Sequence, residues 1–212
     1  AGDGDLQEGV SAESASIAGH LGLGNLIAIY DSNQISIEDD TNISFTEDVA
    51  ARYRSYGWQT LEVNWNQPGG YKEDVAALYE AIQEAKSNTE QPTLITLKTI
   101  IGWPSPTKQN TGKIHGSKLG EEELAGLKTA LGFDPAESFV VAPEVLAHTR
   151  KLVERGAEFR STWELGFSKW EQSNPESAQL LERLIAGDLP AELESALPTF
   201  EAGTSLATRA AS

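Results

Sequence analysis

Residues 26–33 have the sequence LIAIYDSN, in which five apolar side chains precede three polar ones. A short, continuous apolar run of this kind is typical of a parallel strand that is buried on both faces. The polar residues then lie where the strand ends and a loop begins. Residues 58–63 and 93–99 are predicted to form two further strands.

Predicted helices alternate with these strands. Residues 11–20 are rich in small and apolar side chains, residues 47–56 end at Gly57, and residues 71–86 carry an apolar stripe. This alternation favours an α/β fold, in which a parallel sheet has helices on both faces. The ligand crevice of such a sheet lies beyond the carboxyl ends of its strands.

The chain after Gly120 is predicted to be a helical extension, with helices over 121–131 and 145–172 and no further strand. Aromatic side chains recur at helical spacing in the longer helix, and we expect them to lie in a core: Trp163, Phe167 and Trp170. Residues 188–212 contain Pro190 and Pro198 and are predicted to form an extended linker.

Composition excludes several classes of protein. The 212 residues have a formal net charge of -16, which opposes binding to nucleic acid or to an anionic membrane surface. No stretch reaches the roughly 18 apolar residues that a membrane-spanning helix requires. The chain has no cysteine, which suits a reducing cytoplasm and excludes both disulfide bonds and a thiolate metal site.

One pattern of residues predicts a metal site. Asp3 lies between Gly2 and Gly4, and Asn33 follows Asp3 by 30 residues, at the end of the first strand. In a βαβ unit these segments end at the same sheet edge, so a carboxylate and an amide oxygen can meet on one Mg²⁺ ion. Gly4 would let a phosphate approach the backbone. Asp-Gly is also a common turn sequence, so the GDG motif alone leaves a simple turn as the alternative.

The same residues resemble a known family. GDG, about thirty residues and then Asn is the thiamine diphosphate fingerprint, and the surrounding GDGDLQEGVSAES (2–14) and LGNLIAIYDSNQISI (23–37) resemble transketolases specifically. The resemblance continues through PTLITLKTIIGWPSPTKQNTGKIHGSKLG (92–120) to LATRAAS (206–212). It therefore covers essentially the whole chain.

The resemblance implies roles for particular residues around the cofactor. Asp3, the side chain of Asn33 and the main-chain oxygen of Ile35 match the family's magnesium ligands, and Ca²⁺ could substitute for Mg²⁺. Gly4 and Asn33 match contacts to the diphosphate of the cofactor. His115 matches a histidine that touches both cofactor and substrate, where imidazole can donate a hydrogen bond or move a proton.

Arg209 matches an arginine that binds the phosphate of the substrate, for which a planar, permanently charged guanidinium is well suited. The alternative is an ordinary arginine in a disordered terminus.

As the complete enzyme, a transketolase would transfer a two-carbon ketol unit from a ketose phosphate to an aldose phosphate in the pentose phosphate pathway. Sugar phosphates are the implied substrates, and a cytoplasmic homodimer is the implied form. Two alternatives stay open: a dihydroxyacetone synthase, which has the same fold and local motifs, and a non-catalytic metal- and phosphate-binding subunit that needs a partner chain.

The resemblance also implies an incomplete enzyme. We expect residues 1–187 to be a partial diphosphate-binding domain, lacking its N-terminal side, with a helical extension. Residues 188–212 would lead to a pyrimidine-binding domain that is absent from this sequence. A fragment of this kind is expected to be inactive alone.

Overall fold

The computed structural model describes residues 1–211 and divides into two compact units, Ala1–Phe139 and a second unit that begins at Val140. The first unit contains a parallel sheet between helices, and the described part of the second contains helices and loops. The predicted α/β fold with a helical C-terminal part is confirmed.

Three parallel strands form the sheet, in the order β1, β7, β4. Their bounds are Ile27–Ser32 for β1, Thr93–Lys98 for β7 and Gln59–Asn64 for β4. Ile27 and Gln59 both lie opposite Thr93, so the carboxyl ends of all three strands meet at one edge. The three predicted strands are therefore confirmed, with small shifts of their ends.

The central strand β7 carries the core of the sheet, because its residues 93–97 are all buried. Leu94 points into one apolar cluster and Ile95 into the other, as alternation along a strand requires. The start of the chain lies along the free edge of β1: the Asp31 N–H donates a 2.8 Å hydrogen bond to the carbonyl oxygen of Ala1. This contact fixes where α1 begins.

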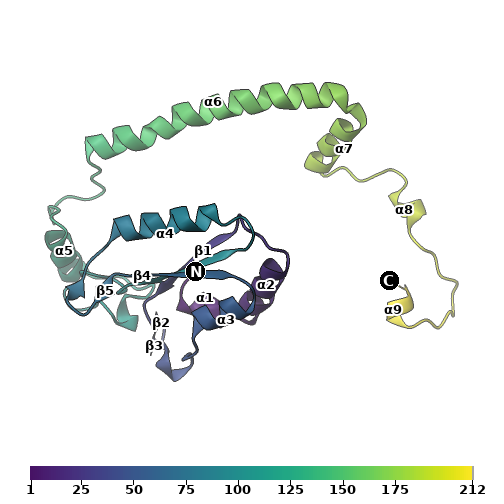
Figure 1. Cartoon of the computed structure of the whole chain (residues 1–212). Coiled ribbons are helices and arrows are strands. Elements are labelled where there is room, and N and C mark those ends of the chain that lie inside the picture. Colours follow the sequence, from purple (N-terminus) through teal and green to yellow (C-terminus); the bar gives the residue numbers. More distant parts are fainter. Residues whose placement is uncertain (212) are drawn as a thin grey trace. The chain divides into compact units, whose positions relative to one another are not determined.

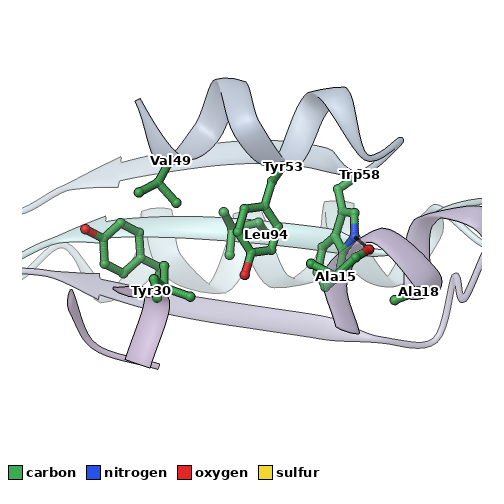
Figure 2. Close-up of a cluster of buried hydrophobic side chains, with 8 residues drawn as sticks. Ala15, Ala18, Tyr30, Val49, Tyr53, Trp58 and Leu94 are labelled. Atoms are coloured by element: carbon green, nitrogen blue, oxygen red, sulfur yellow. Dashed lines mark hydrogen bonds between the residues drawn. The ribbon is translucent and has the colours of Figure 1, made fainter. Parts of the chain in front are cut away.

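Three helices cover one face of the sheet (Figure 1): α1 (Asp3–Gln7), α2 (Gly9–His20) and α3 (Val49–Ser55). Figure 2 shows side chains of α2 and α3 around Leu94. The indole N–H of Trp58 donates to the carbonyl oxygen of Ala15 at 2.8 Å, so the buried ring has its polar atom satisfied. Gly19 permits close packing, since a Cβ atom there would lie 1.8 Å from the carbonyl oxygen of Tyr56.

The opposite face is covered by α4 (Val75–Ser87), which packs against Ile95. This helix begins later than the predicted residue 71. Asp74 is its N-cap and accepts a 2.9 Å hydrogen bond from the N–H of Ala77, which fixes the first turn. Tyr71 lies in a hairpin instead.

Two small hairpins were not predicted, because two-residue strands are too short to produce an alternating pattern. One pairs β2 (Ile35–Ser36) with β3 (Asp39–Asp40), and the other pairs β5 (Asn66–Gln67) with β6 (Gly70–Tyr71). The first unit is completed by two short 3₁₀ helices and one α-helix: η1 (Thr41–Ile43), η2 (Gly112–Ile114) and α5 (Glu121–Ala130).

The second unit contains α6 (Pro143–Ser173), α7 (Pro175–Ala186), α8 (Leu193–Ala196) and α9 (Thr208–Ala211). The aromatic side chains of α6 stack on one another, with ring centroids 4.8 Å apart for Trp163 and Phe167 and 5.5 Å apart for Phe167 and Trp170. Trp163 is nevertheless 57% exposed and Trp170 37% exposed. The expectation that this stripe lies in a core is therefore wrong, because α6 has no buried residue.

The predicted domain boundary at residue 187 falls at the end of α7, where Gly187 adopts φ 74° as the C-cap. The compact units instead divide at residue 139, so the predicted domains stay a prediction. Among residues 1–211, no helix is both long enough and apolar enough to cross a membrane.

Candidate functional site

Asp3 is the buried centre of the candidate site. Asp3 is the first residue of α1, and it is only 3% exposed. The Tyr30 hydroxyl donates to Oδ1 at 2.6 Å, and the main-chain N–H groups of Asn33 and Gln34 donate to Oδ2 at 3.2 and 2.9 Å. The structure therefore brings Asp3 to the turn that follows β1. Burial and the bond to Asp3 raise the pKa of Tyr30, which stays a neutral donor.

Asn33 shapes this turn. Its Oδ1 atom accepts a 3.0 Å hydrogen bond from the N–H of Ile35, while Gln34 between them adopts φ 62°. Asparagine commonly closes such turns by bonding the backbone two residues on. Ile35 then begins β2, with its side chain buried. Hydrogen bonds thus join the three predicted metal ligands: Asn33 donates its N–H to the Asp3 carboxylate, and Ile35 donates its N–H to the Asn33 side chain.

Space is available beside this carboxylate. A Cβ atom at Gly4 would meet no other atom within 4 Å. Gly4 therefore leaves the first turn of α1 open on that side, as approach of a phosphate to the backbone requires.

The charge of Asp3 makes the site suitable for a cation. Its oxygens accept hydrogen bonds from three neutral donors, and none of the ion pairs between the residues that the structure describes includes Asp3. A buried carboxylate is costly unless a positive charge compensates it. Carboxylate, amide and main-chain oxygens are hard ligands of the kind that Mg²⁺ binds.

The chain alone does not provide a full set of ligands. Residues 1–211 contain no cluster of three or more histidine or acidic side chains that could hold a metal ion. Mg²⁺ usually keeps several waters and binds one or two carboxylates together with phosphate oxygens. The residues present therefore fit a Mg²⁺ ion that is completed by a diphosphate, with Asp3, Asn33 and Ile35 as the protein's share.

A cleft of about 400 Å³ also reaches Asp3. Its lining includes Tyr30 and Lys98 but none of Gly4, Asn33 and His115. Acidic side chains line it as well: Glu47, Asp48 and Glu62. Negative charge of this kind disfavours an anionic ligand, so we place the candidate site on the Gly4 and Asn33 side of the carboxylate instead.

His115 is exposed and follows η2 directly, with its main-chain N–H donating to the carbonyl oxygen of Gly112 at 3.0 Å. The segment lies on the β2–β3 hairpin, because the N–H of Gly112 donates a 2.7 Å hydrogen bond to Oδ1 of Asp39. The structure thus brings the His115 segment to the hairpin that begins at Ile35. Arg209 lies in α9 of the second unit, and its role stays a prediction.

Glu123 is a buried residue of the site region that sequence reasoning missed. Its carboxylate accepts hydrogen bonds from the Ser105 hydroxyl, from the N–H and hydroxyl of Thr107 at 2.7 and 2.8 Å, and from the N–H of Lys108 at 3.0 Å. The bond from Ser105, followed by the Thr107 N–H, lowers the pKa of Glu123 to about 2. Glu123 thereby fixes the first half of the loop that carries His115. Its only sequence signal is an acidic residue in the first turn of a helix, which is too common to be informative.

Comparison with known proteins shows the family to which the chain belongs. Residues 1–190 match the family model described as "Transketolase, thiamine diphosphate binding domain". The chain belongs to the transketolase family. The matched residues include Asp3, Asn33, Ile35 and His115, and the match confirms the family resemblance of the sequence.

Individual transketolases are similar over the whole chain. A transketolase from Mycobacterium leprae is 51% identical over 213 residues, which include 100% of this chain and 30% of that protein. One from Geobacillus stearothermophilus is 47% identical, over 100% of this chain and 31% of that protein. The chain thus spans about 30% of the length of these relatives.

A solved structure agrees. The crystal structure of a Pichia stipitis transketolase in complex with sedoheptulose 7-phosphate matches with a TM-score of 0.81 at 44% identity. The match covers 99% of this chain and 30% of that one.

Proposed function

We propose that this chain is the diphosphate-binding part of a complete transketolase, which transfers a two-carbon ketol unit from a ketose phosphate to an aldose phosphate. The observation that carries the proposal is the buried Asp3 carboxylate, joined to the Asn33 turn without a cationic partner in the described chain, in a family of thiamine diphosphate-binding domains. Crystal structures of Pichia stipitis transketolase in complex with sedoheptulose 7-phosphate and with xylulose 5-phosphate support sugar phosphates as substrates.

In this proposal the protein's residues bind and orient. Asp3, Asn33 and the main-chain oxygen of Ile35 would hold Mg²⁺, for which Ca²⁺ could substitute, and Gly4 and Asn33 would contact the diphosphate. Thiamine diphosphate, when bound, supplies stabilisation of a carbanion, which the side chains of this chain cannot provide. Tyr30, Asn33 and Gln34 keep the Asp3 carboxylate oriented through their hydrogen bonds.

His115 and Arg209 would act on the substrate. An imidazole on an exposed loop can donate a hydrogen bond to a substrate oxygen or move a proton near neutral pH. The guanidinium of Arg209 would bind the substrate phosphate through paired hydrogen bonds. We also propose a cytoplasmic homodimer that acts in the pentose phosphate pathway. The chain's net charge of -16 repels small anionic substrates. Local cations such as Mg²⁺ and Arg209 would offset this repulsion at the site.

The test is a ketol-transfer assay on the complete protein, loaded with Mg²⁺ and thiamine diphosphate. Xylulose 5-phosphate is the donor, and the acceptor is either ribose 5-phosphate or formaldehyde. We expect transfer to ribose 5-phosphate, and its loss in Asp3→Ala and Asn33→Ala. Glu38→Ala removes a negative charge from the nearby turn and is the matched control, which should retain activity.

Other outcomes identify the alternatives. Transfer to formaldehyde with little transfer to ribose 5-phosphate would identify a dihydroxyacetone synthase. Binding of cofactor without transfer to either acceptor would identify the non-catalytic subunit and overturn the proposal.

A further inference from the structure

Asp39 has an unusual backbone conformation. It follows the two-residue turn between β2 and β3, and its φ is 91°. L-residues rarely adopt positive φ, because Cβ then crowds the backbone, and glycine is the usual choice at such positions. A strained residue of this kind persists where its surroundings fix it, and it justifies looking for what its side chain does.

The side chain of Asp39 holds a segment that is distant in sequence. Its Oδ1 atom accepts a 2.7 Å hydrogen bond from the N–H of Gly112, 73 residues further along the chain. The two backbones also pack closely, since a Cβ atom at Gly112 would lie 2.8 Å from the N atom of Asp39 and 3.1 Å from the carbonyl oxygen of Ile37. Only a residue without a side chain fits there.

The hairpin links this contact to the candidate metal site. Asp40, next to Asp39, lies opposite Ile35 in the β2–β3 pair, and Ile35 donates its N–H to the side chain of Asn33. On the other side, the carbonyl oxygen of Gly112 accepts the N–H of His115. Strand pairing in the hairpin, together with these hydrogen bonds, therefore joins the Asn33 turn to the residue that would touch the substrate.

We propose that Asp39 is a positioning residue, which couples the metal- and cofactor-binding turn to the His115 loop. This inference rests on the proposed function for the role of His115. Asp39 acts through Gly112 and the hairpin, so its loss should affect the placement of His115 more than the affinity for the metal. Glu123 fixes a different part of the same loop, because its carboxylate accepts hydrogen bonds from Ser105, Thr107 and Lys108.

Three substitutions separate the contributions of Asp39. Asp39→Asn keeps an oxygen acceptor, and asparagine tolerates positive φ, so it should behave like the wild type. Asp39→Gly removes the acceptor and relieves the strain. Asp39→Ala removes the acceptor and keeps the strain. Glu38→Ala removes the same charge from the neighbouring position and controls for electrostatics.

The experiment uses the complete protein with Mg²⁺ and thiamine diphosphate. Amide hydrogen exchange follows residues 111–116 with and without the cofactor, and steady-state kinetics give KM for xylulose 5-phosphate. In the wild type, loading the cofactor should slow exchange in this segment. In Asp39→Gly and Asp39→Ala this slowing should disappear, and KM should rise about three- to tenfold, as loss of one intramolecular hydrogen bond of ordinary strength implies.

A double-mutant comparison distinguishes positioning from a merely structural role. In a His115→Ala background, Asp39→Gly should leave KM unchanged, because the residue through which it acts is already gone. An equal rise in KM with and without His115 would overturn the proposal, as would unchanged exchange and KM in Asp39→Gly. If the wild type binds no cofactor, the proposed function fails and the coupling with it. If the wild type binds cofactor and Asp39 has no effect, the coupling alone fails.

Discussion

The central strand β7 and the long helix α6 have equally clear apolar patterns but opposite environments. In β7, residues 93–97 are all buried, and Ile95 is 0% exposed. In α6, a helix of 31 residues, no residue is buried and Trp163 is 57% exposed. The difference teaches that an apolar pattern specifies a local element, whereas burial depends on what else the chain brings to it.

The origin of the difference is long-range pairing. β7 pairs on one side with β1 and on the other with β4, while helices close both faces. The stripe of α6 is satisfied by neighbours within the same helix, through stacking of Trp163 on Phe167 and of Phe167 near Trp170. Such contacts lie one helical turn apart and do not need a tertiary partner.

The largest effect should come from truncating the same residue type in the two units. Ile95→Ala should lower the free energy of unfolding of the first unit by about 3–4 kcal/mol, because it leaves a cavity between the sheet and α4. Ile185→Ala lies in α7 of the second unit, where the side chain is 79% exposed. It should change the free energy of unfolding of that unit by less than about 0.5 kcal/mol. Urea unfolding measures the free energy of unfolding of both variants. Equal losses in Ile95→Ala and Ile185→Ala would contradict the difference in burial between the two units.

A smaller effect is expected from Asp3→Asn. The amide has only one acceptor oxygen for the three donors around Asp3, and its NH₂ group would face the donor or donors that the oxygen does not reach. The free energy of unfolding should therefore fall by about 2 kcal/mol. Asp188→Asn, at an exposed position of the second unit, is the matched control and should be nearly neutral. Chemical denaturation at neutral pH measures both, and an Asp3→Asn variant as stable as the control would contradict the structure.

Glu123 should make the stability of the first unit depend on pH in the acid range. Its pKa is lowered from 4.5 to about 2 in the folded chain, so the ionised form stabilises the fold at pH values above 4.5. The stability that wild type has over Glu123→Gln should therefore diminish as the pH falls from about 4.5 toward about 2. Unfolding midpoints across this range measure it, with Glu144→Gln in the first turn of α6 as the control for helix position. A constant difference at all pH values would argue against the hydrogen bonds of Glu123.

Only a small effect on stability is expected from truncation in α6. Trp163→Ala should change the free energy of unfolding by less than about 1 kcal/mol, because the ring is largely exposed and contacts mainly Phe167. Loss of the stacked pair should still reduce the near-ultraviolet circular dichroism. A loss of several kcal/mol would mean that the stripe is buried after all.

The order of strands and helices could be predicted from sequence, because it depends on periodicity and on glycine and proline. The meeting of Asp3 with the Asn33 turn also followed from sequence, since the βαβ topology places both segments at one sheet edge. The Tyr30 hydrogen bond to Asp3 could not be predicted, because it depends on which face of β1 the ring takes. The Asp39 contact depends on two loops that are 73 residues apart, and no local pattern encodes it.

The most direct test of the account is calorimetric titration of thiamine diphosphate into the complete protein in the presence of Mg²⁺. The wild type should bind, and Asp3→Ala and Asn33→Ala should bind at least about a hundredfold more weakly, because each would remove one of the proposed metal ligands. Circular dichroism of each variant checks that the fold is intact. Affinity unchanged in a folded Asn33→Ala variant would contradict the assignment of the site.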